Sequence, residues 1–488
     1  MSDLTEISAE TLDAIKKATT AGVNSSTGLQ GVDLSDVISL IPINTPFFDS
    51  LAHTSPTEGA TLAQWKALVN VNETQPDPSI GFDYAGNLAN IDELDVGAYF
   101  KPLAMGYTVT QDSINLAKGY ADAKAIAINN ALLQWKLGAD RKALGGQNFA
   151  LSLPGTPNLV ASATGGSIAA STTVTVQVAA KTLSNYNYGG STAATTAGSV
   201  TTASGGDTNS VVATWTESVG AVAYDVYVAG FYYTTVTTNK VTVTSVPTQN
   251  AATVPNLPGL YRTAPTAVPA TDSSAKANDF NGLLASLAGD YASGGAFGLL
   301  THGSGVSSGA KHLTLDGASF TVNGQNVSEL DELFGLIYND VQLSPDELLM
   351  SSDLASSISS AVLSNGSGYT TFAPNNVAER QDVILGGFAA YYINKAAGGT
   401  PVKISVQPNL ASGTVIAKTN SVPFPNSNIT NTVELRDLQP VSDYEYGTSR
   451  QAGVAGGGPR FDGETRSLTT FINRAPVAMG WISNVAVA

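Results

Sequence analysis

The sequence contains no cysteine in 488 residues, and it has only three histidines, His53, His302 and His312. Disulfide bonds, thiolate nucleophiles and thiolate metal ligands are therefore excluded. Charged residues are also scarce, at 13% of the chain against roughly 25% in an average protein. Small residues take their place, with 48 glycines and long runs of Ala, Ser and Thr. Such a composition is typical of extended β structure, or of surface that other subunits cover.

Two further features are lacking. The N-terminal stretch MSDLTEISAETLDAIKKATT has no apolar secretory core, and no stretch is long and apolar enough to cross a bilayer. The net charge of −16 argues against a phosphate-binding groove, where Lys and Arg must replace counterions. It leaves open that the protein encloses nucleic acid without gripping it. We expect a chain made in a cytosol and not bound to a membrane.

The longest predicted helix runs from Asp112 to Leu144 and would be about 50 Å long. Its apolar or small residues recur at steps of three and four: Ile114, Ala117, Ala121, Ala125, Ile128, Leu132 and Trp135. Thr110 or Asp112 can cap its start, and Gly145-Gly146 would end it in a left-handed turn. A second apolar row on its other side indicates a spine covered by other elements.

The chain before this helix reads as extended. In residues 1–55 an apolar cluster surrounds Pro42 and Pro46, which suits packing on a neighbouring molecule or on the edge of the chain's own core. Residues 56–110 alternate in character and predict a long two-stranded excursion. Asp92, Glu93 and Asp95 within it lack the spacing of a calcium loop, and a solvated loop is the expectation.

The composition changes sharply over residues 152–269, where charged residues nearly vanish and helical periodicity disappears. Short β-branched runs separated by turn residues predict a self-contained β-sandwich. The runs are Thr173–Val178, Ser210–Thr216, Ala223–Val228 and Lys240–Val246. The segment VVATWTESVGAVAYDVYVAG resembles fibronectin type III or immunoglobulin-like modules, and flanking prolines resemble linkers at an insertion.

Mixed signals return in the last part of the chain. We expect helices from Asp279 to Tyr291 and from Ser328 onward, then strands at Phe388–Ile393, Pro401–Val406 and Gly413–Lys418. The segment RFDGETRSLTTFINRAPVAMGWISNVAVA predicts a strand, a turn at Arg474-Ala475-Pro476 and a final strand.

The patterns that could carry catalysis are weak. Gly305 to Gly309 fits the esterase nucleophile motif around Ser307, but it lacks the strand and helix that such an elbow requires. His302 and His312 flank it and are expected to be flexible surface residues, and only His53 remains as another base. Gly294–Gly298 follows a helical stretch and is no dinucleotide loop. We therefore predict no enzyme, with no catalytic, cofactor-binding or metal-binding residue.

The remaining candidates have structural explanations. Asp346-Glu347 and the acidic group at Glu329, Asp331 and Glu332 are expected at helix starts, where carboxylates stabilise the dipole.

Aromatic residues in the β-rich stretch could stack on a sugar ring, but a place in the sandwich core or at its rim is expected. They are Tyr186, Tyr188, Tyr232 and Tyr233, together with Trp215, which we assign to the core.

In this order the elements resemble the major capsid proteins of tailed bacteriophages, the Hong Kong 97-type fold. The stretch ETRSLTTFINRAPVAMGWI from Glu464 to Ile482 is the most family-like. The resemblance implies an α+β chain whose parts are an N-terminal arm (1–55), an extended β loop with the strand after it (56–110) and a peripheral domain with the spine helix (111–151). It further implies an immunoglobulin-like insertion (152–269), an axial domain (270–425) and a return to the peripheral domain (426–488).

The same resemblance implies a function. The chain would self-assemble through hexamers and pentamers into an icosahedral head that encloses double-stranded DNA without binding it specifically. Portal, scaffold or cement proteins would be further partners. The protein would be made in the bacterial cytoplasm and end in the virion. Because the arm follows Met1 directly, we expect no removed scaffolding segment. Some family members cross-link a Lys to an Asn, and neither Lys66 nor Lys101 is assigned that role.

Two alternatives stay open. A phage tail protein or secreted adhesin would use the β-sandwich to bind host glycans, and it would form monomers or trimers. A serine hydrolase would depend on Ser307. The arrangement of the extended loop and spine helix separates these hypotheses from a shell subunit.

Overall fold

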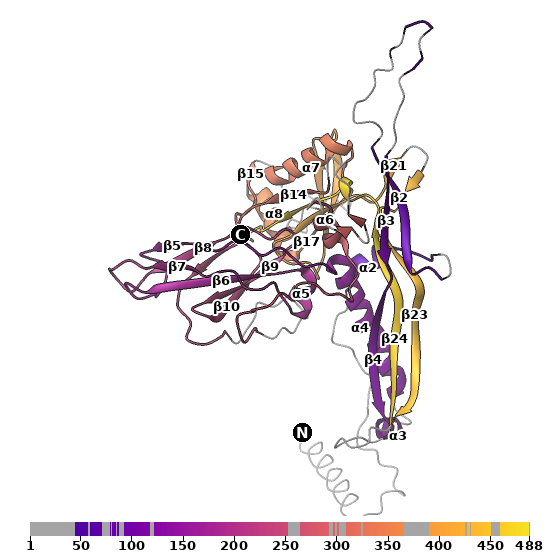
Figure 1. Cartoon of the computed structure of the whole chain (residues 1–488), viewed down its shortest axis with the longest axis horizontal. Helices are drawn as coiled ribbons and strands as arrows, with labels where there is room; N and C mark the ends of the chain where they lie inside the picture. Colours follow the sequence, from indigo (N-terminus) through magenta and orange to yellow (C-terminus); the bar gives the residue numbers. More distant parts are fainter. Residues whose placement is uncertain are drawn as a thin grey trace, which may run out of the picture.

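The computed structural model describes residues 44–56, 59–70, 79, 81–83, 85–86, 92–117, 122–251, 264–291, 296–297, 300–301, 309–323, 326–365, 390–424, 427–429, 431–449 and 459–487. Figure 1 shows a long sheet on one side, the β-rich stretch pointing away on the other and a mixed layer of helices and strands between them. The expected mixed α+β class is confirmed.

The long sheet has the order β1-β23-β24-β4. Its strands are β1 (Ala52–Thr54), β23 (Val433–Ser449), β24 (Arg460–Asn473) and β4 (Lys101–Thr110). β1 runs parallel to β23, and the other pairs are antiparallel. At about 3.3 Å per residue, the 17 residues of β23 reach roughly 55 Å. The sheet therefore joins segments from both ends of the chain.

The spine is two helices, α3 (Gln111–Ala117) and α4 (Ala123–Gly145), so the prediction of one continuous helix from Asp112 is wrong. The reason is Asp122, which takes an extended backbone and whose Oδ1 accepts the N–H groups of Lys124 and Ala125 at 3.0 and 3.2 Å. This caps a new helix. Thr110 is the cap of α3, because its Oγ1 accepts the N–H of Ser113.

The helix ends at the predicted glycines, but for another reason. Gly146 has a φ of −58°, so no left-handed turn is present. A Cβ at Gly145 would lie 2.3 Å from Leu183 Cβ, and one at Gly146 would lie 2.5 Å from the Phe280 carbonyl oxygen. Close packing requires the glycines here. Along its length α4 packs on β4 and β24, and Trp135 Nε1 donates to the Leu103 carbonyl at 3.3 Å.

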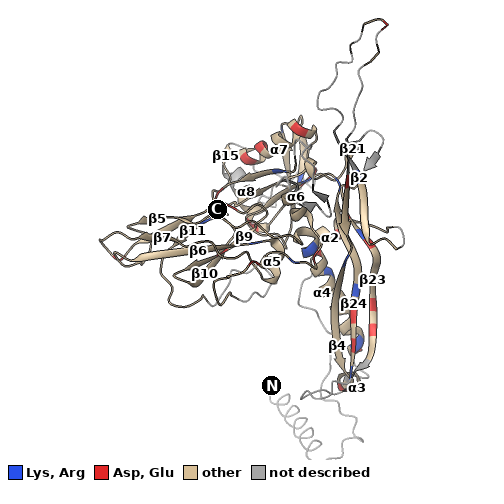
Figure 2. Cartoon of the chain, viewed as in Figure 1, with Lys and Arg blue, Asp and Glu red and all other residues tan. Residues whose placement is uncertain are grey.

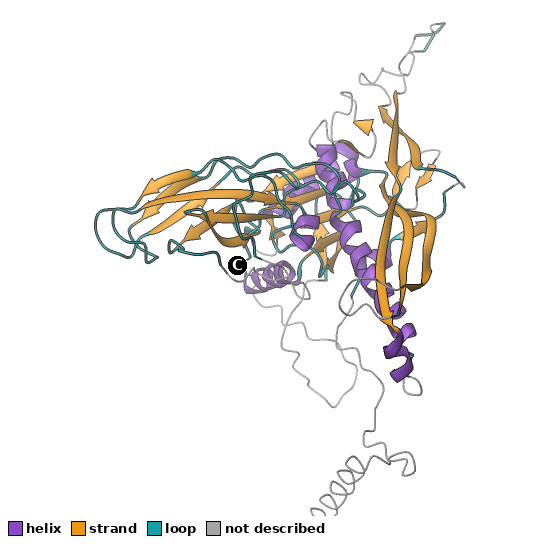
Figure 3. Ribbon diagram, turned by 60° about the horizontal axis from the view of Figure 1, so that its bottom comes forward, coloured by secondary structure: helices purple, strands orange, loops and turns teal. Residues whose placement is uncertain are grey.

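The excursion predicted before the spine is the hairpin of β2 (Leu62–Asn70) and β3 (Asp92–Tyr99). Its strands pair only with each other among the described strands. Figures 1 and 3 show it continuing beyond the long sheet, away from the helices. The acidic residues Asp92, Glu93 and Asp95 belong to β3, so the expectation of a solvated loop is wrong.

The β-rich stretch forms two sheets, of order β10-β9-β6-β7 and β11-β8-β5. Their strands are β5 (Asn158–Ser162), β6 (Thr173–Lys181), β7 (Gly198–Thr201), β8 (Ser210–Thr214), β9 (Ala223–Val228), β10 (Phe231–Val236) and β11 (Lys240–Val243). All four predicted runs are strands that begin at the predicted residues. Trp215 is 4% exposed in the core between the sheets, as predicted.

The mixed layer is built on a six-stranded sheet of order β14-β25-β20-β17-β19-β18. Its strands are β14 (Lys311–Thr314), β25 (Gly480–Ser483), β20 (Val415–Lys418), β17 (Glu347–Met350), β19 (Thr400–Val406) and β18 (Tyr391–Asn394). Helices α7 (Ser328–Val341) and α8 (Ser352–Asn365) cover one face through a cluster that contains Leu333, Phe334 and Leu354. The predicted helix at Asp279 begins later, as α6 (Leu283–Tyr291).

Short elements complete the described fold. They are α2 (Pro46–Ser50), α5 (Leu183–Tyr188), the 3-10 turn η1 (Pro476–Ala478) and three small hairpins, β12–β13 (Ala296–Phe297, Leu300–Thr301), β15–β16 (Val322–Asn323, Asn326–Val327) and β21–β22 (Val422–Phe424, Ser427–Ile429).

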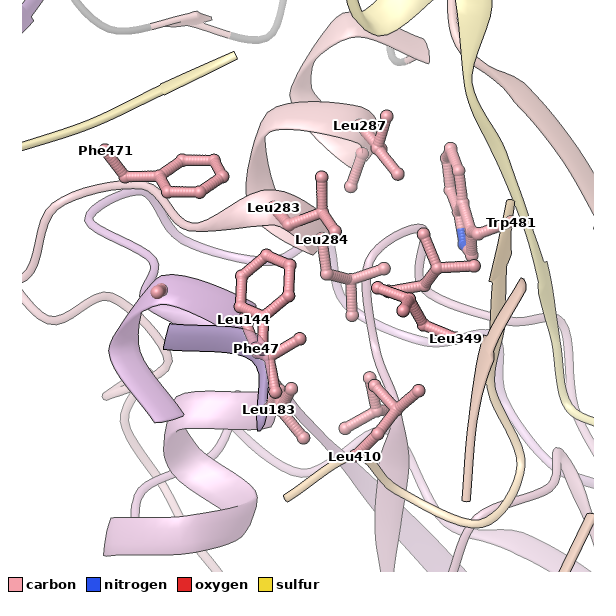
Figure 4. Close-up of a cluster of buried hydrophobic side chains, with 14 of the residues drawn as sticks. Phe47, Leu144, Leu183, Leu283, Leu284, Leu287, Leu349, Leu410, Phe471 and Trp481 are labelled. Atoms are coloured by element: carbon pink, nitrogen blue, oxygen red, sulfur yellow. The ribbon is translucent and has the colours of Figure 1, made fainter. Parts of the chain in front are cut away.

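One hydrophobic cluster joins the long sheet, the spine, the β-rich stretch and the mixed layer (Figure 4). It gathers Phe47 from α2, Leu144 from the spine, Leu183 from α5, Leu283 from α6 and Trp481 from β25. The β-rich stretch therefore has its own core but also shares this one through α5, which differs from the expected self-contained sandwich. Burial of large side chains from five segments fixes those segments relative to each other.

Candidate assembly surface

The β2–β3 hairpin forms a two-stranded sheet of its own, which joins no other strand among the described residues. In the two strands Trp65 lies opposite Val96, and Lys66 lies opposite Asp95. The two faces of the hairpin therefore carry different kinds of side chain. Ala63 and Val96 are buried on one face, whereas Gln64, Lys66 and Tyr99 are exposed or half-exposed on the other. A hairpin of two strands is only marginally stable in water, and its open edges are templates for further pairing. Its geometry suits contact with another molecule.

The root of this hairpin is fixed to the body. Ala63, Phe100 and Ile472 form a small buried cluster with Trp65 packed against it. Lys101 Nζ donates to the Ala277 carbonyl at 2.9 Å. The hairpin is therefore held at its base, and Lys101 has a structural role in this molecule.

The long sheet has one face against α4 and one face without a covering layer among the described elements. On that second face, Arg460, Asp462, Glu464 and Arg466 alternate along the central strand β24. Arg460 pairs with Asp462 at 3.4 Å and Arg466 with Glu464 at 3.2 Å. The period-two charges in RFDGETR were visible in the sequence, but they predicted only a strand. This face of the long sheet therefore adds polar and charged residues to the candidate assembly surface that begins at the hairpin.

On the face toward α4 the sheet is held by hydrogen bonds. Tyr107 OH donates to Asp443 Oδ2 at 3.0 Å, and burial together with this hydrogen bond raises the pKa of Tyr107 to about 12. Lys124 reaches from α4 to Glu445 at 2.6 Å. The spine and the sheet are thus one rigid support for the exposed face.

The N-terminal arm has its described root in the chain's own core. Phe47 is fully buried, and the N–H of Phe48 donates to Asp140 Oδ1 at 2.8 Å. Lys136 pairs with Asp49 at 2.7 Å. Residues 44–56 therefore pack on the chain's own core, which was one of the two alternatives expected for the arm. Residues 1–43 of the arm lie outside the described residues. The role of Asp140 was not predicted from the sequence, because no local sequence pattern indicates that a carboxylate will be buried.

Ser307, on which the serine hydrolase alternative depends, lies outside the described residues, as do His302 and most of Gly294–Gly298. His53 lies on β1 with Nδ1 at 2.7 Å from Asp437 Oδ2. His312 is not a flexible surface residue, and that expectation is wrong. Its side chain is 4% exposed and its ring stacks on Trp481 at 4.3 Å, because the residue belongs to strand β14 rather than to a loop.

The acidic candidates have structural partners. Glu329 and Asp331 lie in the first turn of α7 as predicted, and Tyr392 OH donates to Asp331 at 2.7 Å. Asp346-Glu347 starts strand β17 rather than a helix, so that part of the prediction is wrong. Asp346 accepts the N–H of Asn420 at 2.7 Å, and Glu347 lies 3.5 Å from Lys418 Nζ.

The aromatic candidates on the insertion divide into core and surface. Tyr232 is fully buried and Tyr186 is 5% exposed, as expected for core or rim residues. Tyr188 is 46% exposed and lies near Lys142.

In the part of the chain that the structure describes, no helix combines the length and hydrophobicity that a membrane span requires. Over the same residues, no group of three or more His, Asp or Glu side chains could hold a metal ion.

A buried polar cluster joins the insertion to the mixed layer. Glu217 from the β-rich stretch accepts a hydrogen bond from Ser483 Oγ at 2.7 Å. His312 Nε2 lies 2.9 Å from the same Ser483 Oγ. Burial lowers the pKa of His312 from 6.5 to about 4 and raises the pKa of Glu217. At this junction burial therefore disfavours the charged form of each group.

This junction predicts a pH effect. Because the pKa of folded His312 is depressed, its stabilising contribution is complete above pH 6.5 and is lost as the pH falls toward 4. The parent should lose up to about 1.4 kcal/mol per pH unit relative to His312→Gln in that window. Both proteins carry Glu217→Gln in this comparison, because Glu217 Oε1 lies 3.3 Å from His312 Nε2 and its opposite effect would otherwise change with the substitution. Urea unfolding of both proteins at several pH values measures the difference, and a difference that does not vary with pH would contradict the assignment.

No family model matches the sequence, and no curated protein matches it. Among solved structures, the chain is similar to the capsid of cyanophage A-1(L), with 8% identity over 94% of this chain and 97% of that chain at a TM-score of 0.44. It is similar to the capsid of the Myoviridae phage XM1, with 7% identity over 93% and 97% at a TM-score of 0.39. The SrpI encapsulin complex of Synechococcus elongatus gives 9% identity over 94% of both chains at a TM-score of 0.39.

Proposed function

We propose that the protein is the major capsid protein of a tailed bacteriophage, a shell subunit whose work is self-association. The observation that carries this proposal is the β2–β3 hairpin, which is anchored at its root and extends past the body with both strand edges open in its described part. A structure of this kind gains stability when a neighbouring copy covers it. A monomeric protein would have little use for it.

The surrounding surface supports the same function. The uncovered face of the long sheet lies beside the hairpin. It is carried by a spine that the Lys124–Glu445 ion pair and the hydrogen bond from Trp135 to the Leu103 carbonyl hold against the sheet. Contacts of this type are heterologous, with different patches of two copies meeting, and they close into shells when the angles allow.

Within this proposal the parts take the roles of a Hong Kong 97-type subunit. The hairpin is the extended loop, the long sheet with α3 and α4 is the peripheral domain, and the six-stranded layer is the axial domain. The insertion is an immunoglobulin-like domain exposed on the outer surface, since an insertion is tolerated where it meets solvent. The net charge of −16 suits an inner wall that encloses DNA without binding it. Portal, scaffold or cement proteins would complete the virion.

The test is the assembly state of the full-length chain. After expression in bacteria, we expect closed particles by negative-stain electron microscopy and rapid sedimentation in a sucrose gradient. The adhesin hypothesis predicts monomers or trimers in the same gradient. A monodisperse monomer at high concentration, with or without a co-expressed scaffold, would reject the shell function.

A further inference from the structure

A polar cavity of about 270 Å³ lies where three strands of the six-stranded sheet meet α2 and the start of β23. The sheet lines it with Glu347, Lys403 and Lys418, and the residues on its other side include Ser50 and Asn431. Those last two residues are exposed, so the cavity opens to solvent. Its volume is just below the roughly 300–1,000 Å³ of pockets for drug-sized ligands, so it suits a smaller molecule.

Charge is concentrated at this cavity. Most of the described chain in Figure 2 carries no charged side chain, and charged residues make up 13% of the sequence, but four of the eight residues that line the cavity are charged. Glu347 on β17 is the register partner of both Lys403 on β19 and Lys418 on β20. Residues directly opposite each other project to the same face of a sheet. The three side chains therefore form one row with the carboxylate at its centre.

Lys418 is the unusual member of this row. Its side chain is only 5% exposed, whereas lysine is almost never fully buried. Its Nζ lies 3.5 Å from Glu347 Oε2 and 5.5 Å from the centre of the Phe47 ring. The carboxylate also has another donor, because Glu347 Oε1 accepts the hydroxyl of Ser405. The buried ammonium group is therefore paired only at the long end of the hydrogen-bond range.

These surroundings favour the neutral amine. Burial lowers the pKa of Lys418, and the Glu347 carboxylate opposes this effect without cancelling it, while the charge of Lys403 adds to it. A desolvated lysine next to another cationic group is an arrangement that activates an amine as a nucleophile. A solvent-exposed lysine lacks this activation and stays protonated near neutral pH.

We propose that Lys418 is a reactive amine that binds a small aldehyde covalently, as an imine, inside this cavity. Lys403 lines the same cavity, is exposed and forms no ion pair with any described residue, so it favours an aldehyde that carries a carboxylate group. This site goes beyond the shell function and does not depend on it.

The reaction balances without an oxidant or a reductant. The lone pair of Lys418 Nζ adds to the aldehyde carbon, so a C–N bond forms and the carbonyl oxygen becomes a hydroxyl group. Glu347 accepts a proton from the nitrogen and returns it to that hydroxyl group, which leaves as water while the C=N bond forms. The separation of 3.5 Å between Glu347 and Lys418 suits this role, because catalytic hydrogen bonds are often long before the substrate is bound.

Reductive labelling of the full-length chain tests the site. The probe is glyoxylate, an aldehyde with one carboxylate, and cyanoborohydride supplies the hydride that converts each imine into a stable secondary amine. Peptide mass spectrometry measures the labelling rate of each lysine near neutral pH. Lys418 should react at least about tenfold faster than Lys240, which is exposed at the start of β11. A rate at Lys418 no higher than at Lys240 would show that the ion pair with Glu347 keeps the amine protonated, and it would overturn the proposal.

Glu347→Gln tests the proton transfer. Loss of the carboxylate should slow the labelling of Lys418 by at least about tenfold and leave Lys240 unchanged. A carboxylate that only held the ammonium charge would have the opposite effect, because its removal lowers the pKa of Lys418 further and speeds labelling. Faster labelling in this variant would therefore overturn the role of Glu347.

Lys403→Met tests the recognition of the carboxylate group. The variant should lose about tenfold more of its rate with glyoxylate than with propanal, an aldehyde that has no carboxylate. Lys395→Met is the matched control, since Lys395 is an exposed lysine that pairs with Asp331 outside the cavity, and both rates should stay at the parental level. Equal losses with the two aldehydes in Lys403→Met would overturn the preference for a carboxylate. Far-UV circular dichroism verifies the fold of each variant.

Discussion

Shortening the β2–β3 hairpin should abolish particle formation while the body stays folded. Trp65 and Val96 are direct cross-strand partners, so residues 66–95 can be replaced by Asn-Gly, which closes the hairpin in a tight two-residue turn. The root cluster of Ala63, Phe100 and Ile472 is retained in this variant. We expect at least about a 100-fold loss of particle yield, which corresponds to the loss of about 2.7 kcal/mol or more of contact energy.

The control for this variant keeps the hairpin at full length. Val160→Ala shortens a 59% exposed side chain on strand β5, outside the hairpin and the long sheet, and surface substitutions of this kind change stability by at most about 0.5 kcal/mol. It should therefore assemble. The melting temperature of the shortened chain should stay within about 4 °C of the parent's subunit value. Particles of parental size formed by the shortened chain would show that the hairpin is not an assembly element.

The second large effect is expected at Phe47, where the arm enters the shared core. Its ring is fully buried, lies 6.4 Å from the Phe471 ring and has Lys418 Nζ 5.5 Å from its centre. Phe47→Ala should cost about 3–5 kcal/mol of unfolding free energy, because it leaves a cavity where the arm, spine and β25 meet. Urea unfolding followed by tryptophan fluorescence measures the loss, since Trp481 belongs to the same cluster.

Phe82→Ala provides the comparison, because the Phe82 side chain is 100% exposed. This variant should lie within about 0.5 kcal/mol of the parent. Equal losses for the two substitutions would mean that Phe47 does not anchor the arm in solution.

Much of the secondary structure could be predicted because it depends on local pattern. The β-branched runs of the insertion begin at the predicted residues, since alternation and turn residues define strands without reference to the rest of the chain. The prediction of one continuous spine helix was wrong at one point, for an equally local reason. Asp122 satisfies two backbone N–H groups and begins a new helix, although apolar periodicity continues through it.

The candidate site was predicted only in outline. An extended hairpin before the spine was expected, but which of its residues are buried at the root and which are exposed was not. Tyr99 of the hairpin and Tyr444 of the long sheet look like core residues in the sequence, because a large aromatic side chain in a strand usually faces a core. They are 50% and 39% exposed, and this exposure depends on which faces other segments cover.

The sequence alone determined the α+β class, the order of the elements and the exclusion of cysteine chemistry, because these follow from composition and short-range periodicity. Tertiary structure alone decided which strands pair, as when β24 lies between β4 and β23, with Arg460 opposite Thr110 from a distant part of the chain. It also decided that His312 is buried and that Gly145 meets Leu183. Pairing and burial are set by the free energy of the whole packed chain, and no local window of residues contains that sum.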